Sequence, residues 1–301
     1  MPLSWFACAH CGFWQRHFAP PDCPVCTDTR NDLPEDGWRF LPETEVAATH
    51  DGAWRQAADD LWAFTTTPAL GLAGTGWLIV RSDGNIAFEA APYYSAAMLA
   101  QIGALGGIRF LAASHAHGYG ALFQLQRAFA PEVAIHRDDL RMTKAFRVTW
   151  PYDDVLDIGG GCALHHVGGH YEGQAALHDA PGRRLFCGDM FKIDQDAGGR
   201  STAISSHKAF HKDIPLTHAE LRRYRDVIAP LDFDAVLTPF EYAPEVGRDL
   251  ALRVLDEALA RRPEVRRVPL DSVTPALSRG PASVAGQGSG TPGQARGDEE
   301  L

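Results

Sequence analysis

The chain has 301 residues, of which 45% are hydrophobic, and this length suits one sizeable domain with a small appendage. Its formal net charge of −10 at pH 7 disfavours nonspecific nucleic-acid binding, which requires a basic surface. No run of about 20 apolar residues is present, so we expect no membrane span. No secretory leader precedes the first cysteine, so we expect reduced cysteines and a cytoplasmic location.

Two C-x2-C motifs lie near the start of the chain, one at Cys8 and Cys11 and the other at Cys23 and Cys26. Two such pairs at close spacing predict a four-thiolate site for one metal ion. The motifs resemble zinc ribbons and rubredoxin-like modules, so we expect Zn2+, with iron as the alternative. Disulfides are the other alternative, which the expected reducing location disfavours.

The segments that follow alternate between strand-like and helix-like patterns. We expect strands at residues 61–66, 76–81, 86–90, 110–114, 132–136, 163–167, 184–187 and 235–238, and helices at 95–105, 121–130, 138–145, 217–228 and 245–261. Thr217 and Glu220 have the spacing of a capping box at the start of one helix. This alternation is typical of the α/β class.

Three of these predicted strands end in potential metal ligands: His115 and His117, then His170, then Asp189. Side chains at positions i and i+2 of an extended segment project to one side, and ligand loops of α/β sheets lie where strands end. We therefore expect one Zn2+ or Fe2+ at a site where three histidines leave a coordination position for water. Asp189 is either a fourth ligand, which would make the site structural, or a proton acceptor.

These residues occur in the order Ser114-His115-Ala116-His117, Gly169-His170 and Gly188-Asp189. At these motifs the chain resembles the metallo-β-lactamase fold superfamily, over roughly residues 61–246, with residues 84–89 where the family carries an early strand and acidic turn. The resemblance implies an αββα sandwich, preceded here by the cysteine ribbon. We expect the ribbon at residues 1–30, a connector at 31–45, the sandwich at 46–268 and a disordered tail at 269–301.

Two positions depart from the superfamily pattern. The Asp-His pair after the second histidine reads Tyr119-Gly120, and the late Pro-Gly-His reads Pro239-Phe240-Glu241. The replaced residues normally hold a second metal, so we expect only one ion in this domain and no metal on Glu241. Tyr119 is a candidate donor to substrate and therefore a candidate catalytic residue, or else a buried tyrosine with a satisfied hydroxyl.

Further histidines lie near the predicted site. His207 and His211 follow Asp189 in the loop where superfamily members build substrate pockets, and we take His207 as a candidate catalytic residue. At a spacing of four they share a face if the segment is helical, although a solvated loop is equally compatible with the sequence. His166 lies at an even spacing from His170, and we expect it to be a supporting or structural residue.

The resemblance implies a mononuclear metal-dependent hydrolase whose activated water attacks an ester, thioester or amide carbonyl of a small-molecule substrate. Asp189 would orient that water or accept its proton. Two alternatives stay open. One is an iron redox protein in which the ribbon passes electrons to an iron site. The other is a noncatalytic metal-binding protein that binds a ligand, or a protein partner through the ribbon.

Overall fold

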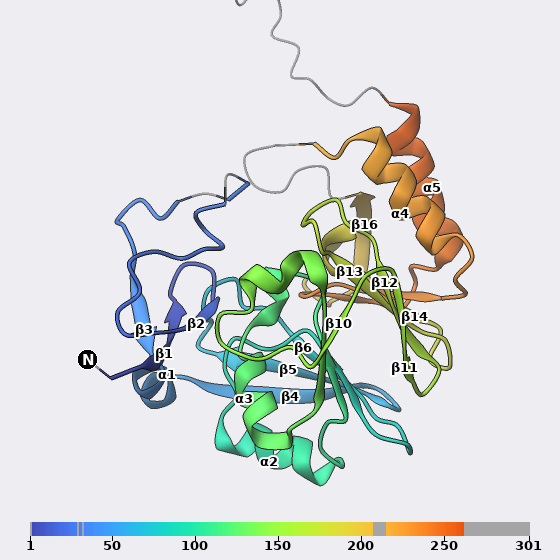
Figure 1. Ribbon diagram of the computed structural model, residues 1–301. Helices are drawn as coiled ribbons and strands as arrows, with labels where there is room; N and C mark the ends of the chain where they lie inside the picture. The colour runs from blue at the N-terminus through green and yellow to red at the C-terminus, as the bar shows by residue number, and fades with distance from the viewer. Residues whose placement is uncertain (1, 29, 32, 207–214, 262–301) are drawn as a thin grey trace, which may run out of the picture. The chain divides into compact units, whose positions relative to one another are not determined.

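The computed structural model describes residues 2–28, 30–31, 33–206 and 215–261 (Figure 1). Contacts within the chain define two units, Met1–Pro263 and Glu264–Leu301. The four-cysteine segment and the predicted sandwich both belong to the first unit. The second unit lies outside the described residues, and so does the predicted disordered tail at 269–301.

The first large sheet has seven strands. Their order is β10 (Trp150–Tyr152), β9 (Glu132–His136), β8 (Phe110–Ala112), β7 (Ile86–Phe88), β6 (Gly76–Ile79), β5 (Leu61–Thr67) and β4 (Asp51–Ala58). The pairs from β7 to β10 are parallel and those from β4 to β7 are antiparallel. The strands predicted at 61–66, 76–81, 86–90, 110–114 and 132–136 are thereby confirmed.

The second large sheet has six strands. Their order is β11 (Val155–Gly159), β12 (Cys162–His166), β13 (Ala175–Asp179), β14 (Arg184–Phe186), β17 (Ala235–Leu237) and β18 (Tyr242–Ala243). Only β14 and β17 pair in parallel among these strands. A separate hairpin joins β15 (Phe191–Gln195) to β16 (Ser201–Ser206). The strands predicted at 163–167, 184–187 and 235–238 are confirmed.

The two large sheets pack face to face through alternate residues of their strands. Trp77 and Phe88 from the first sheet meet Phe186 of the second edge-on, with ring centroids 6.4 and 5.8 Å apart. Leu78 lies between Trp77 and Ile79, which face the other sheet. Its own side chain belongs to a different hydrophobic cluster, on the outer face of the first sheet. This period of two places one apolar layer between the sheets and one outside each of them.

Helices cover both outer faces. α2 (Ala96–Ala104) and α3 (Leu122–Phe129) share a core with the first sheet, and α4 (His218–Ile228) and α5 (Arg248–Ala260) share one with the second (Figure 1). The predicted capping box is present, because Glu220 N donates to Thr217 Oγ1 and Thr217 N to Glu220 Oε2. The helix expected at 138–145 is instead the 3-10 helix η2 (Arg137–Met142). These layers form the expected αββα sandwich.

The four-cysteine segment forms its own small sheet. Its strands are β1 (Ser4–Cys8), β2 (Trp14–His17) and β3 (Phe40–Pro42), and α1 (Glu43–Thr49) follows directly. Trp5 stacks on Phe123 of α3 at 5.4 Å, and Trp14 Nε1 donates to the carbonyl of Pro92 at 2.7 Å. The small sheet therefore shares a core with the sandwich. In the described part of the chain, no helix has the length and apolar composition needed to cross a membrane.

Candidate metal sites

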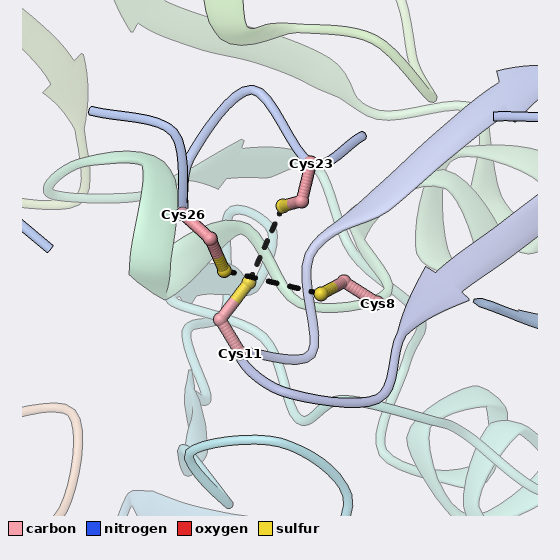
Figure 2. A group of neighbouring side chains, drawn as sticks. All are labelled: Cys8, Cys11, Cys23 and Cys26. Carbon is pink, nitrogen blue, oxygen red and sulfur yellow. Dashed lines mark hydrogen bonds between the residues drawn. The ribbon is translucent and has the colours of Figure 1, made fainter. Parts of the chain in front are cut away.

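The four N-terminal cysteines converge on one point (Figure 2). The Sγ atoms of Cys8 and Cys26 lie 3.9 Å apart and those of Cys11 and Cys23 lie 3.6 Å apart. In a tetrahedron with metal–sulfur bonds of about 2.3 Å, neighbouring sulfurs lie about 3.8 Å apart. All six cysteines of the chain are buried free thiols, so the disulfide alternative is wrong. The four side chains fit one tetrahedral metal ion.

The second group of candidate ligands lies at the ends of three strands. His115 follows β8, and the 3-10 helix η1 (Ala116–Tyr119) then carries His117. His170 follows β12, and Asp189 lies in η3 (Gly188–Met190) directly after β14. The positive φ of 54° at Gly188 lets the chain turn here, where a Cβ atom would lie 2.5 Å from that of Ser114. The four ligands therefore lie where strands of the two sheets end, as expected from the sequence.

The four side chains of this group offer ligand atoms that all lie within 4.8 Å of one another. Asp189 Oδ2 lies 3.4 Å from Nε2 of His115 and 3.4 Å from Nε2 of His170. His115 and His170 are buried and His117 is half-buried, whereas the Asp189 side chain keeps 13% of its surface exposed. Three imidazoles and one carboxylate form a donor set that suits Zn2+ or Fe2+.

The electrostatics of this group favour an ionised Asp189 beside a neutral His170 and a His115 whose pKa Asp189 raises against the effect of burial. Burial opposes the charge of Asp189, but His115 and His170 outweigh it and hold the pKa of Asp189 well below its ordinary value. Burial and the charge of His115 hold the pKa of His170 well below its ordinary value. An anionic oxygen and a neutral ring nitrogen are the forms in which these side chains bind metals.

His115 is oriented by a second layer of polar groups. Ser114 Oγ lies 2.8 Å from His115 Nδ1 and donates to Oε1 of Glu89, and Ser114 N lies 3.3 Å from Glu89 Oε2. Glu89 directly follows β7, where the resemblance placed an acidic turn, and it is buried. Burial raises the pKa of Glu89 to about 7, against the opposing effect of His115 and the Ser114 hydrogen bonds.

The positions that would hold a second metal are occupied differently. Gly120 has a φ of 37°, and a Cβ atom there would lie 2.3 Å from the carbonyl oxygen of Ala90. Glu241 accepts a hydrogen bond from the Thr238 hydroxyl, and it is not among the described groups that could hold a metal. Tyr119 is only 1% exposed and packs edge-on against Phe146 at 5.4 Å, so its role toward substrate stays a prediction.

Of the other predicted histidines, His207 and His211 lie outside the described residues. His166 accepts a hydrogen bond from Arg223 Nη2 at 2.8 Å and lies 2.7 Å from the carbonyl oxygen of Glu172. Its ring stacks on that of His136 at 3.6 Å, and these two histidines form a third potential metal group with Asp138. These two contacts fix the ring of His166 between Arg223 and the backbone of Glu172.

Sequence reasoning missed the residues that hold the His170 segment. Arg30 Nη1 donates to the carbonyl oxygen of His170 at 2.8 Å, and His170 N donates to the hydroxyl of Tyr224 at 3.1 Å. A pocket of about 400 Å³ adjoins His170 and is lined also by Arg30, Glu172 and Leu216. No motif marks Arg30 or Tyr224, because each lies far from His170 in the sequence.

Comparison with known proteins assigns the fold. No family model matches the chain. It is 24% identical over 257 residues to the Uncharacterized protein YmaE of Bacillus subtilis (strain 168), over 82% of this chain and 92% of that protein. Solved structures of TMB-1, of the DIM-1 metallo-β-lactamase and of VMB-1 match with TM-scores of 0.53, 0.51 and 0.51 and identities of 7%, 8% and 10%. Each alignment covers 69% of this chain and 98% of the other.

The chain is therefore an α/β protein with the metallo-β-lactamase fold, as its motifs indicated. More particularly, it joins that fold to an N-terminal four-cysteine module and carries a site of three histidines and one aspartate. At these identities the structural likeness identifies the fold and leaves the reaction open.

Proposed function

We propose that the protein is a mononuclear metal-dependent hydrolase. The observation that carries the proposal is the convergence of His115, His117, His170 and Asp189 within 4.8 Å, at the strand ends of this fold. We propose zinc for this site and for the four cysteines, and a small-molecule substrate with an ester, thioester or amide carbonyl. Location in the cytoplasm fits the reduced state of the cysteines.

The three histidines and Asp189 would hold the metal. Such an ion polarises a carbonyl oxygen and lowers the pKa of a water molecule to about 7. Asp189 Oδ2, which lies 3.4 Å from Nε2 of His115 and of His170, would orient that water. Tyr224 and Arg30 fix the backbone of His170, so the imidazole is held before substrate arrives. The pocket of about 400 Å³ beside His170 is large enough for part of a small substrate.

One ion at this site, and not two, is supported by the same geometry. A side chain at position 120 would collide with the Ala90 carbonyl, and Glu241 is engaged by Thr238. Elemental analysis of protein purified without added metal tests the stoichiometry. We expect two metal ions per chain in the wild type and one in the His115→Ala/His117→Ala double variant. His50→Ala, which removes a partly exposed histidine at the end of α1, should keep both.

Activity is tested with a panel of thioesters, lactones and amides. Hydrolysis by the metal-loaded wild type should fall by at least about 100-fold in His117→Ala, the half-buried ligand whose removal disturbs the core least. A wild type that carries only the cysteine-bound metal would overturn the proposal. Full metal content without hydrolysis would favour the noncatalytic binder, and a red four-cysteine site would favour the iron redox protein.

A further inference from the structure

Tyr171 contacts the rings of all three histidine ligands. It stacks on His115 with centroids 5.1 Å apart and planes at 29°. It meets His117 and His170 edge-on, at 5.7 and 4.8 Å. The side chain is fully buried. Because a close-packed interior transmits small shifts, the position of this one ring constrains all three imidazoles.

The four-cysteine module holds the outer end of Tyr171. Asn31 Nδ2 donates to the Tyr171 hydroxyl at 3.2 Å and to the carbonyl oxygen of Val25 at 2.6 Å. Val25 lies between Cys23 and Cys26, inside the second metal-binding turn. Two hydrogen bonds thus connect that turn to the aromatic ring beside the histidines.

Arg30 makes a second connection. Its guanidinium lies 4.4 Å above the Tyr171 ring while Nη1 donates to the carbonyl oxygen of His170. The same guanidinium is paired with both carboxylate oxygens of Asp28, at 2.8 and 2.7 Å, and with Glu172 at 3.2 Å. These ion pairs use Nε and Nη2 and orient the planar guanidinium, so that Nη1 points to the carbonyl oxygen of His170.

The loop that carries these residues is built on the second pair of cysteines. Thr27 donates from its backbone N–H and its hydroxyl to the carbonyl oxygen of Cys23, at 2.9 and 3.0 Å. Asp28 N donates to Val25 O and Asn31 N to Asp28 O. Metal binding supplies much of the folding free energy of small four-cysteine modules.

We propose that the four-cysteine module is an integral support of the histidine site, in which Arg30 and Asn31 act through Tyr171 and His170 as positioning residues. Metal bound to the cysteines then raises the affinity of the histidine site for its own metal. This inference rests on the proposed function only in requiring that the three histidines and Asp189 bind a metal; it does not depend on hydrolysis. By thermodynamic linkage the effect is reciprocal, so metal at the histidines stabilises the cysteine-bound ion equally.

Cobalt substitution tests the inference in the full-length protein, since the two sites absorb differently. Thiolate-to-cobalt charge-transfer bands report the four cysteines, and weaker visible bands report the nitrogen and oxygen ligands. Titration with Co2+ gives an affinity for each site. Arg30→Met keeps the aliphatic stem but removes the guanidinium. It should weaken Co2+ binding at the histidine site about 10- to 100-fold, the usual effect of losing a supporting contact, while the thiolate bands persist.

Arg16→Met is the matched control. Arg16 is exposed in the same module, and its guanidinium lies 4.9 Å above the Trp5 ring. The substitution therefore removes a similar contact between a guanidinium and an aromatic ring, but one that lies away from the histidines. We expect no change in either cobalt affinity. Tyr171→Phe keeps the ring but loses the Asn31 bond, and should weaken the histidine site less than Arg30→Met does.

Reciprocity gives a readout that a merely structural role would not change. The affinity of the cysteines for Co2+, measured at equilibrium against a competing chelator, should be higher when the histidine site is filled, and His117→Ala should abolish that difference. Equal histidine-site affinities in wild type and Arg30→Met would overturn the inference while leaving the proposed metal site intact. Absence of any histidine-site cobalt signal in the wild type would overturn both.

Discussion

The hydroxyl of Ser114 lies 2.8 Å from Nδ1 of His115. The same hydroxyl donates to Glu89, so Ser114 is itself held in place. The ring nitrogen on the other side of His115, Nε2, lies 3.4 Å from Asp189. Ser114 therefore orients the imidazole so that Nε2, the nitrogen that would bind a metal, faces the other ligands.

Replacing Ser114 by alanine should weaken metal binding at the histidine site by about 10- to 100-fold, because His115 loses its orienting partner. Two buried groups would also lose a hydrogen bond, which should lower the free energy of unfolding by about 1–3 kcal/mol. Metal competition titration and urea denaturation measure the two effects. Ser205→Ala, at an exposed position of β16, should change neither. Wild-type metal affinity in Ser114→Ala would contradict this role.

The buried carboxyl of Glu89 should make stability depend on pH. Its pKa rises from 4.5 in the unfolded chain to about 7, so between these values the folded protein binds more protons than the unfolded chain. Stability from this group is fully present below about 4.5 and is lost as pH rises to 7, by up to about 3 kcal/mol. Glu89→Gln should flatten this slope. Urea denaturation at several pH values, on samples of equal metal content, measures the pH dependence of the free energy of unfolding. The same pH dependence in the wild type and in Glu89→Gln would refute the prediction.

Gly118 should tolerate no side chain. A Cβ atom at this position would lie 1.6 Å from Glu89 Oε2, so Gly118→Ala must displace the carboxylate that holds Ser114. We expect a loss of about 1–3 kcal/mol in unfolding free energy and weaker metal binding at the histidines. Gly103→Ala is the control, because a Cβ atom within α2 there would meet nothing closer than 3.9 Å, and alanine favours the helix. Equal effects of both substitutions on metal affinity would contradict the steric argument.

The four ligands of the histidine site were predictable because each follows an apolar strand, and strand ends gather at one rim. The supporting residues were not. Arg30 and His170 lie 140 positions apart, and only the folded chain shows that the module reaches the ligand loop. Tyr171 was equally hidden, since a single aromatic residue after a histidine has no distinctive spacing.

β4 and β13 are two of the strands that the sequence did not predict, for a related reason. β4 has mostly exposed residues, and its extended form depends on pairing with β5 from Asp51 opposite Thr67 onward. β13 begins with two alanines, which favour helix when isolated, but hydrogen bonding to β12 on one side and β14 on the other outweighs that preference. Pairing of this kind is a tertiary interaction and leaves little trace in local sequence.

Asp179 should be a major contributor to stability away from both metal sites. It is fully buried and accepts hydrogen bonds from Arg81 Nη2 at 2.5 Å and Arg184 Nε at 2.9 Å, so it links a residue beside the first sheet to one in the second. Asp60, which also pairs with both arginines, is partly exposed and cannot replace it. Removing one member of such a network leaves buried guanidinium charge without its main partner.

Asp179→Ala should therefore lower the free energy of unfolding by about 3–5 kcal/mol while the metal content stays at the wild-type value. Asp83→Ala is the matched control, because Asp83 is half exposed and pairs with Arg109 at 3.8 Å, an interaction worth less than about 1 kcal/mol. Urea denaturation of the three proteins measures the difference. If Asp179→Ala lost no more stability than Asp83→Ala, the two sheets would be joined by their apolar layer alone, and the buried ion pairs would add nothing to it.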